Sequence, residues 1–184
     1  MTSRLPCAAI ALFLTFTVAP SARGEGVAKA EALLSGCTDP AISGAARLIE
    51  EMSDEGVKEV AVHLRMFGLS DGKHAVHVHE TGACEPCSAA GGHFDPGPAG
   101  FSSPDGNHPF HLGDLVNIEA RGGAAVLKTT TTRITLSPGP LSILDEDGSA
   151  MIVHVGPDTY CPDGAVSGCA GGARAACGVF EMSE

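Results

Sequence analysis

The chain has 184 residues, with 22 Asp plus Glu against 11 Lys plus Arg and a formal net charge of −11. This length suits one domain of ordinary size. The acidity argues against nucleic acid as a partner, because duplex binding depends on cations that neutralise phosphates. A hydrophobic content of 43% argues against a wholly disordered chain, and 18% charged residues with no Trp argue against a long helical bundle.

Residues 1–22 have the pattern of a secretory signal peptide. Arg4 supplies a basic start, residues 8–19 form an apolar run, and small residues follow. The run is too short for a comfortable transmembrane helix. We therefore expect cleavage between residues 19 and 24, export to the periplasm or extracellular space, and no membrane span afterwards. Leu34-Ser35-Gly36-Cys37 resembles a lipoprotein cleavage box, but charged residues separate it from the apolar run, so we expect no lipid anchor at Cys37.

Beyond the signal peptide, residues 23–41 are rich in Ala and charges and predict a weakly ordered or short helical leader before a folded domain at 42–184. Apolar residues alternate with polar ones over 60–67, and this period of two predicts a half-buried strand. Further strands are expected at 73–79, 124–128, 130–136, 150–155 and 175–180. A loop at 81–110 is dense in Gly, Pro, Ser and Asp, and loops of this length are usually functional or disordered. Short strands separated by turn signals predict an antiparallel sandwich or barrel.

Histidines cluster around this loop. His77 and His79 lie two apart on a predicted strand, so their side chains share a face and form a partial site for zinc or copper. An isolated pair of this kind is more often two surface residues. The other histidines near the loop and on a distant strand change that balance, and they are His93, His108, His111 and His154, with Asp114 close by. His63 shares a face with Arg65 and is expected in solvent, and His74 is left outside the site.

Five motifs in this order carry a resemblance: His77-Val78-His79-Glu80-Thr81-Gly82-Ala83-Cys84, Gly91-Gly92-His93-Phe94-Asp95-Pro96, His111-Leu112-Gly113-Asp114, Ile152-Val153-His154 and Gly171-Gly172-Ala173-Arg174-Ala175-Ala176-Cys177. Over residues 42–181 the chain resembles a copper/zinc superoxide dismutase of the exported bacterial type. The resemblance implies an all-β fold, an eight-stranded antiparallel Greek-key β-barrel (an immunoglobulin-like sandwich) with two long metal-bearing loops. It also implies superoxide as substrate, with copper and zinc as cofactors.

The resemblance assigns roles to residues of this chain. His77, His79 and His154 match the copper ligands, and His93 matches the histidine that bridges copper and zinc. His111 and Asp114 match zinc ligands, and Asp158 matches a carboxylate that links ligands of the two metals. Arg174 matches the arginine that docks the anion, and an imidazole that can take up a proton makes His93 the acid–base partner. A homodimer is left open, because the barrel face used for pairing varies within the family.

Two departures from the family pattern affect these expectations. The family has a further zinc histidine in the loop after the bridging residue, but residues 94–107 contain no His. The fourth zinc ligand is therefore His108, or water, or the site binds zinc weakly. The cysteines that follow the signal peptide are also more numerous than the family's single bridge requires. The resemblance implies Cys84–Cys177, with Cys87 as the alternative to Cys84. We also expect Cys161–Cys169, which closes a short loop beside Arg174, and, by elimination, Cys37–Cys87.

Two other functions compete with superoxide disproportionation. The first is a dismutase-like module that stores or delivers copper without turnover, and it is disfavoured because delivery requires no anion-docking arginine. The second is a purely structural secreted β-domain, which would leave the converging histidines unexplained.

Overall fold

The computed structural model describes Met1 and residues 27–97, 108–164 and 166–184. The predicted signal peptide falls almost entirely on residues 2–26, which lie outside the described part of the chain. Within the described residues, no helix is long and apolar enough to cross a membrane.

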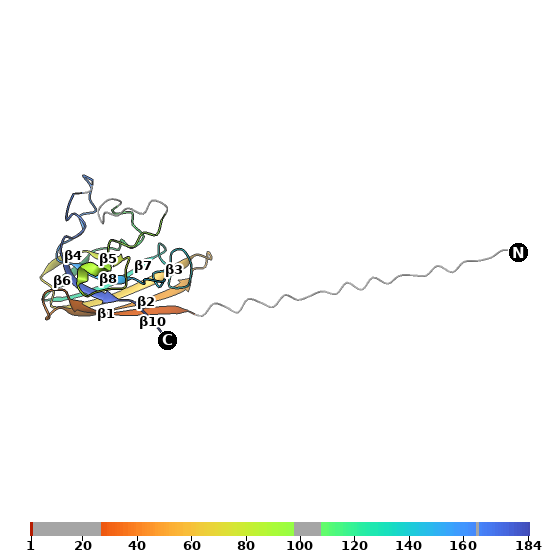
Figure 1. The fold of residues 1–184 in the computed structure, drawn as a ribbon, viewed down its shortest axis with the longest axis horizontal. Helices are drawn as coiled ribbons and strands as arrows, with labels where there is room; N and C mark the ends of the chain where they lie inside the picture. The colour runs from red at the N-terminus through yellow and green to blue at the C-terminus, as the bar shows by residue number, and fades with distance from the viewer. Residues whose placement is uncertain (2–26, 98–107, 165) are drawn as a thin grey trace.

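The fold is all-β, as the sequence predicted, with its strands in one antiparallel sheet (Figure 1). The strands are β1 (Ala28–Gly36), β2 (Ser43–Met52), β3 (Lys58–Phe67), β4 (Gly72–His74), β5 (Val76–His79), β6 (Ile118–Arg121), β7 (Ala124–Thr131), β8 (Ala150–His154), β9 (Arg174–Val179) and β10 (Glu181–Ser183). One 3-10 helix, η1 (Cys87–Ala90), follows β5. The sheet order is β4-β6-β7-β3-β2-β1-β9-β8-β5, with β10 paired to β1.

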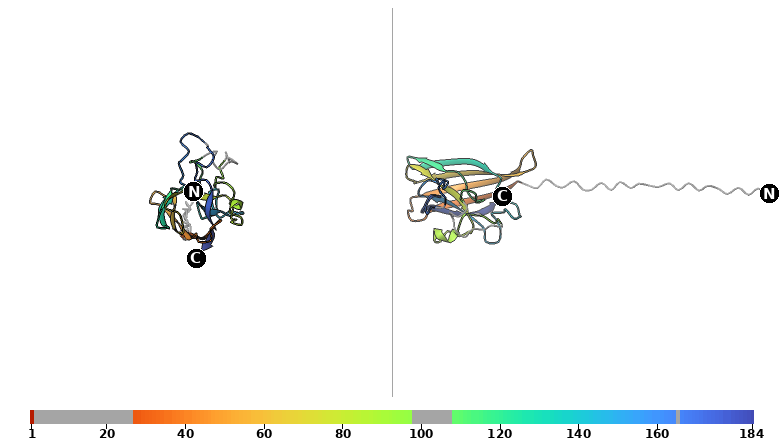
Figure 2. Two further views of the ribbon diagram at one scale, coloured as in Figure 1. Left: turned by 90° about the vertical axis from the view of Figure 1, so that its left-hand side faces the viewer. Right: turned by 90° about the horizontal axis from the view of Figure 1, so that it is seen from above.

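The two ends of this order, β4 and β5, are separated only by Ala75, so one bent strand closes the sheet on itself. With β4 and β5 taken as that single strand and β10 as a short addition to β1, the barrel has the eight strands that the resemblance implied. The left view of Figure 2 looks along the barrel and shows the strands arranged around its interior.

The core follows from the period of two. On β3, Val60, Val62, Leu64 and Met66 are fully buried, while His63 and Arg65 are exposed on the outer face. The strand β5 differs, because both of its faces are buried. Val76 and Val78 face the core. His77 and His79, which alternate with them, face outward under the loops that cover this side of the barrel. The green and blue loops of Figure 1 gather on that side.

The leader predicted at 23–41 is wrong for most of its length. Its residues from Ala28 to Gly36 form β1, in the middle of the sheet between β2 and β9. Ala30, Ala32 and Leu34 are buried, so the period of two is present. It was overlooked because alanine is a weak strand signal. The strands expected at 124–128 and 130–136 are a second correction, because residues 124–131 form the single strand β7 and residues 132–136 lie beyond its end.

Three disulfides join Cys37 to Cys87, Cys84 to Cys177 and Cys161 to Cys169. These are the pairs expected from the sequence.

Candidate metal centre

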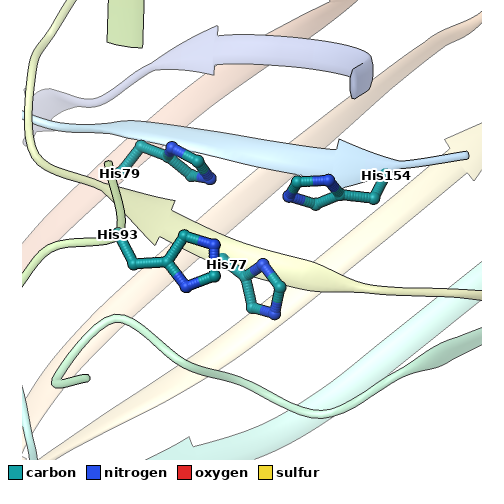
Figure 3. Close-up of side chains that lie close together, drawn as sticks. All are labelled: His77, His79, His93 and His154. Atoms are coloured by element: carbon teal, nitrogen blue, oxygen red, sulfur yellow. The ribbon is translucent and has the colours of Figure 1, made fainter. Parts of the chain in front are cut away.

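Four imidazole rings meet on the outer face of β5 and β8. His77 and His79 come from β5, His154 ends β8, and His93 pairs through its backbone with His79. One nitrogen from each ring lies within 4.8 Å of the others. Figure 3 shows the four rings gathered around a common space. All four side chains are buried.

Each of three rings is held by one nitrogen and presents the other. The holding contacts are His77 Nε2 to Asp158 Oδ2 at 3.1 Å, His79 Nδ1 to Gly91 O at 3.0 Å, and His154 Nδ1 to Gly172 O at 2.9 Å. The opposite nitrogens, His77 Nδ1, His79 Nε2 and His154 Nε2, are buried without a hydrogen-bond partner. Unpartnered buried nitrogens cost free energy, and rings oriented by outer contacts are typical of metal ligands. These residues fit a copper ion.

The protonation of these rings suits metal binding. Burial, together with the neighbouring imidazoles and Arg174, lowers the pKa of His154 to about 3. The same causes hold the pKa of His79 well below its usual range. Burial also lowers the pKa of His93 to about 4, although Asp114 opposes the shift. Near neutral pH the three rings are therefore uncharged, which is the form that coordinates metals.

A second cluster surrounds the carboxylate of Asp114. The Nδ1 atoms of three rings approach its oxygens, from His93 at 2.6 Å, His108 at 3.1 Å and His111 at 3.2 Å. His111 lies outside the tightest group of donors, which comprises His77, His93, His108 and Asp114. The three rings that contact Asp114 supply nitrogen donors, and Asp114 supplies an oxygen. Three nitrogens and one carboxylate oxygen are a typical donor set for tetrahedral zinc, so these four residues fit zinc.

His108 lies inside this cluster and is buried. Its Nε2 is 2.8 Å from Asp158 Oδ1, while the other oxygen of Asp158 contacts His77. One carboxylate thus joins a ring of each cluster. Although burial acts to lower it, the two neighbouring carboxylates raise the pKa of His108 to about 9. Burial acts to raise the pKa of Asp114 and of Asp158, but hydrogen bonds from the neighbouring histidines outweigh it. Both pKa values therefore lie far below the usual range.

Backbone hydrogen bonds place the second cluster beside the first. Val78 N–H donates to Gly113 O and Phe94 N–H donates to Val78 O, both at 2.9 Å. His77 is also bridged to Asp114 in an antiparallel arrangement. The loop residues on either side of the 98–107 segment are therefore in register with the free edge of β5.

A cavity of about 380 Å³ opens onto the copper-type cluster. His79, His93, His154 and Arg174 line it, together with Ser167 and Gly168 from the loop that Cys161–Cys169 closes. Arg174 is half-buried, and its guanidinium donates to the carbonyls of Cys87 and Gly91. A fixed cation thus lines the same cavity as three of the four rings, which suits a small anion. A larger cavity of about 620 Å³ lies beside Arg133 and Tyr160, where no histidine lines it.

Comparisons with known proteins agree with this geometry. A family model described as copper/zinc superoxide dismutase matches residues 42–180. The chain belongs to this family. It is 37% identical over 157 residues to superoxide dismutase [Cu-Zn] A of Xenopus laevis, which covers 83% of this chain and 96% of that relative. It is 35% identical over 151 residues to superoxide dismutase [Cu-Zn] 2 of Aquifex aeolicus, a match that covers 78% of this chain and 81% of that relative. It is 34% identical over 128 residues to the superoxide dismutase [Cu-Zn] of Brucella abortus (64% and 69%).

Sequence reasoning missed several residues that hold this copper/zinc superoxide dismutase site. His74 is buried, and its ring nitrogens contact His154 O at 2.8 Å and Ser70 O at 2.9 Å. The sequence left it outside the site, because a position in or near the turn takes it off the face of His77 and His79. Asn117 lies within the matched residues 42–180, and its amide contacts both the backbone N–H and the carbonyl of Asp158. His63 is exposed, as expected.

Arg133 was also missed, because nothing in its sequence surroundings connects it to the histidines. Its guanidinium donates to His111 O and Asp114 O, both at 3.0 Å. It thus holds the backbone of the His111–Asp114 turn from outside the cluster.

Proposed function

We propose that this chain disproportionates superoxide to dioxygen and hydrogen peroxide at a copper centre supported by zinc. The observation that carries the proposal is the pair of adjoining donor groups, which have His77 and His93 in common, with Arg174 in the lining of the cavity at the first of them. The family match and the relatives named superoxide dismutase support the same reaction.

The copper ligands in this proposal are His77, His79, His93 and His154. The zinc ligands are His93, His108, His111 and Asp114. When bound, copper supplies one-electron exchange between its two oxidation states, and zinc supplies a fixed positive charge without redox chemistry. Asp158 orients His77 and His108 through its two oxygens, so the two sites share a support as well as a ligand.

Arg174 and His93 are the catalytic residues in this proposal. The guanidinium of Arg174 keeps its charge at all working pH values and docks superoxide in the cavity. The Nδ1 atom of His93 faces Asp114, so its Nε2 on the far side of the ring faces the copper-type cluster. We assign this nitrogen to hold a proton and to pass it to the product. Two superoxide anions and two protons give one dioxygen and one hydrogen peroxide.

We place the protein outside the cytoplasm, in the periplasm or the extracellular space. The expected signal peptide at 1–22 supports export, as do three disulfides, since disulfides persist in oxidising compartments. One relative, 34% identical over 128 residues, is an extracellular superoxide dismutase of Drosophila melanogaster.

The test is metal analysis combined with superoxide removal. The purified mature protein is stripped of metal, reloaded with copper and zinc, and assayed by stopped-flow decay of superoxide. We expect one copper and one zinc per chain and rapid decay that metal removal abolishes. Copper binding without turnover would leave a storage or delivery module instead, and no metal binding would leave a structural domain.

A further inference from the structure

One disulfide lies at the first residue of the helix η1, and a second lies three residues before it. Cys84–Cys177 enters three residues before Cys87 and ties this segment to β9, and Cys37–Cys87 ties Cys87 itself to the end of β1. Both bridges contribute to a small apolar cluster with Ala90, Ala150 and Ile152, separate from the barrel core.

This helix supplies the contacts that orient Arg174. One guanidinium nitrogen donates to Cys87 O at the start of η1, and the other donates to Gly91 O just after its end. Gly91 O also contacts His79 Nδ1 at 3.0 Å. A displacement of η1 would therefore move the arginine, and the same carbonyls are not supplied by any strand of the barrel.

On its own, η1 has little to fix its position. It has four residues, its N-terminus has no side-chain cap, and Gly91 N–H closes its end on Ser88 O at 3.3 Å. Short 3-10 helices have poor hydrogen-bond geometry and small intrinsic stability. The position of η1 must therefore be fixed by its contacts with the rest of the protein, which include the two disulfides.

The Cys37–Cys87 bridge completes a closed circuit of contacts around Arg174. Arg174 donates to the carbonyl of Cys87, and the sulfur of Cys87 is bonded to Cys37. The backbone N–H of Cys37 in turn donates to the carbonyl of Ala175, the next residue after Arg174, at 2.8 Å. The circuit begins and ends at adjacent residues of β9. By contrast, Cys84–Cys177 reaches Cys87 only through Glu85 and Pro86.

We propose that the Cys37–Cys87 disulfide positions Arg174, because it keeps the Cys87 carbonyl, and hence the guanidinium, in the lining of the cavity. This rests on the proposed function only for the use to which the arginine is put. The bridge touches none of the metal-ligand candidates directly. His79 shares the carbonyl of Gly91 with Arg174, but the pairing of β5 with β8 also fixes His79, so loss of the bridge acts on the docking of the anion before it acts on metal binding.

The test is the double variant C37S/C87S, which removes the bridge, keeps both backbone carbonyls and leaves no unpaired thiol to attack Cys84–Cys177. In the metal-free protein, modification of Arg174 by phenylglyoxal is followed by peptide mass mapping. We expect it to be several-fold faster than in the parent. In the loaded protein we expect full copper content, kcat/KM for superoxide lower by about three- to thirty-fold, and a weaker dependence on salt.

The matched control is Val62→Ala, which destabilises the barrel from β3 without contact to η1. It should leave the phenylglyoxal rate and the salt dependence unchanged even if its Tm falls as far. Where C37S/C87S does not fold, the parent is partially reduced, alkylated at Cys37 and Cys87 only, and measured in its folded form in the same way.

The outcomes separate the two proposals. Equal modification rates and equal salt dependence in the bridged and unbridged proteins overturn the positioning role, even if the parent removes superoxide rapidly. A parent without metal-dependent turnover overturns the proposed function, yet the modification rates in the metal-free protein still decide whether the bridge positions Arg174.

Discussion

The two clusters share His93 but are built by different means. Three of the four copper-type residues lie on β5 and β8, whose register fixes His77 beside Ile152 and His79 beside Ala150. The zinc-type residues all come from irregular chain between β5 and β6, and polar contacts from Asp158 and Arg133 hold them. A sheet places side chains through many backbone hydrogen bonds, whereas a loop depends on each anchor. The copper-type cluster should therefore tolerate loss of an outer contact better than the zinc-type cluster.

The largest effect is expected from His79→Ala. It removes one ring from a strand whose register does not depend on that ring, so the barrel should stay folded. Copper content should fall sharply, superoxide turnover should drop to the level of the metal-free protein, and zinc content should persist. Metal analysis and stopped-flow assays measure these quantities. Full activity with normal copper would refute the assignment.

The next effect is expected from Arg174→Ala. This change removes the docking cation without touching a ligand, so copper should remain. The rate with superoxide should fall by roughly one order of magnitude or more and depend less on salt. Rates measured across ionic strength test this, with Arg121→Ala as the control, because Arg121 is exposed and pairs only with Glu119 among the described residues. An unchanged salt dependence would show that other groups steer the anion.

His108→Ala separates the two clusters directly. We expect lower zinc content and a lower Tm of the zinc-loaded protein, while copper stays bound. Equilibrium dialysis against zinc and calorimetry measure both quantities. Unchanged zinc occupancy and Tm would make His108 a bystander and leave water as the fourth ligand.

Arg133→Ala tests whether an outer anchor matters more for the loop-borne cluster. Its loss frees the carbonyls of His111 and Asp114, and loss of outer-shell contacts typically costs about ten- to a hundred-fold in metal affinity. We expect weaker zinc binding at the lower end of that range, with copper affinity unchanged. Competition with a chromogenic chelator measures both affinities. Equal losses for the two metals would contradict the contrast between strand and loop.

The smallest effect concerns the barrel and neither metal. Burial acts to raise the pKa of Glu50, but hydrogen bonds from Ser137 and Leu136 and the charge of Lys58 outweigh it and leave the pKa lowered. Its contribution to stability is therefore complete above the unfolded pKa, near 4.5, and is lost as pH falls below it. The Tm difference between the parent and Glu50→Gln should shrink through this range in thermal melts. A constant difference would mean that the charge of Glu50 plays no part.

The sequence predicted that the copper-type side chains converge, because a period of two on a strand fixes which side chains share a face. His77 and His79 had to share a face, and the segment around His154 was itself a strand. The zinc-type cluster was predicted less completely, because spacing along a loop does not fix direction. His108 precedes His111 by three residues, and only the contacts with Asp114 and Asp158 show that its ring turns inward. Long-range contacts, such as those of Arg133 and His74, leave no local signal.

The bent strand that closes the barrel also carries two metal-ligand candidates. One edge of β5 pairs with β8, and the other is covered by the backbone of Phe94, Gly113 and Leu115. An ion held between His77 and the loop would therefore link β5 to the backbone that covers its second edge. Its binding free energy would add to the free energy needed to open the barrel locally at β5. Loss of metal would first loosen the closure rather than the opposite wall, exposing an unpaired strand edge to other chains.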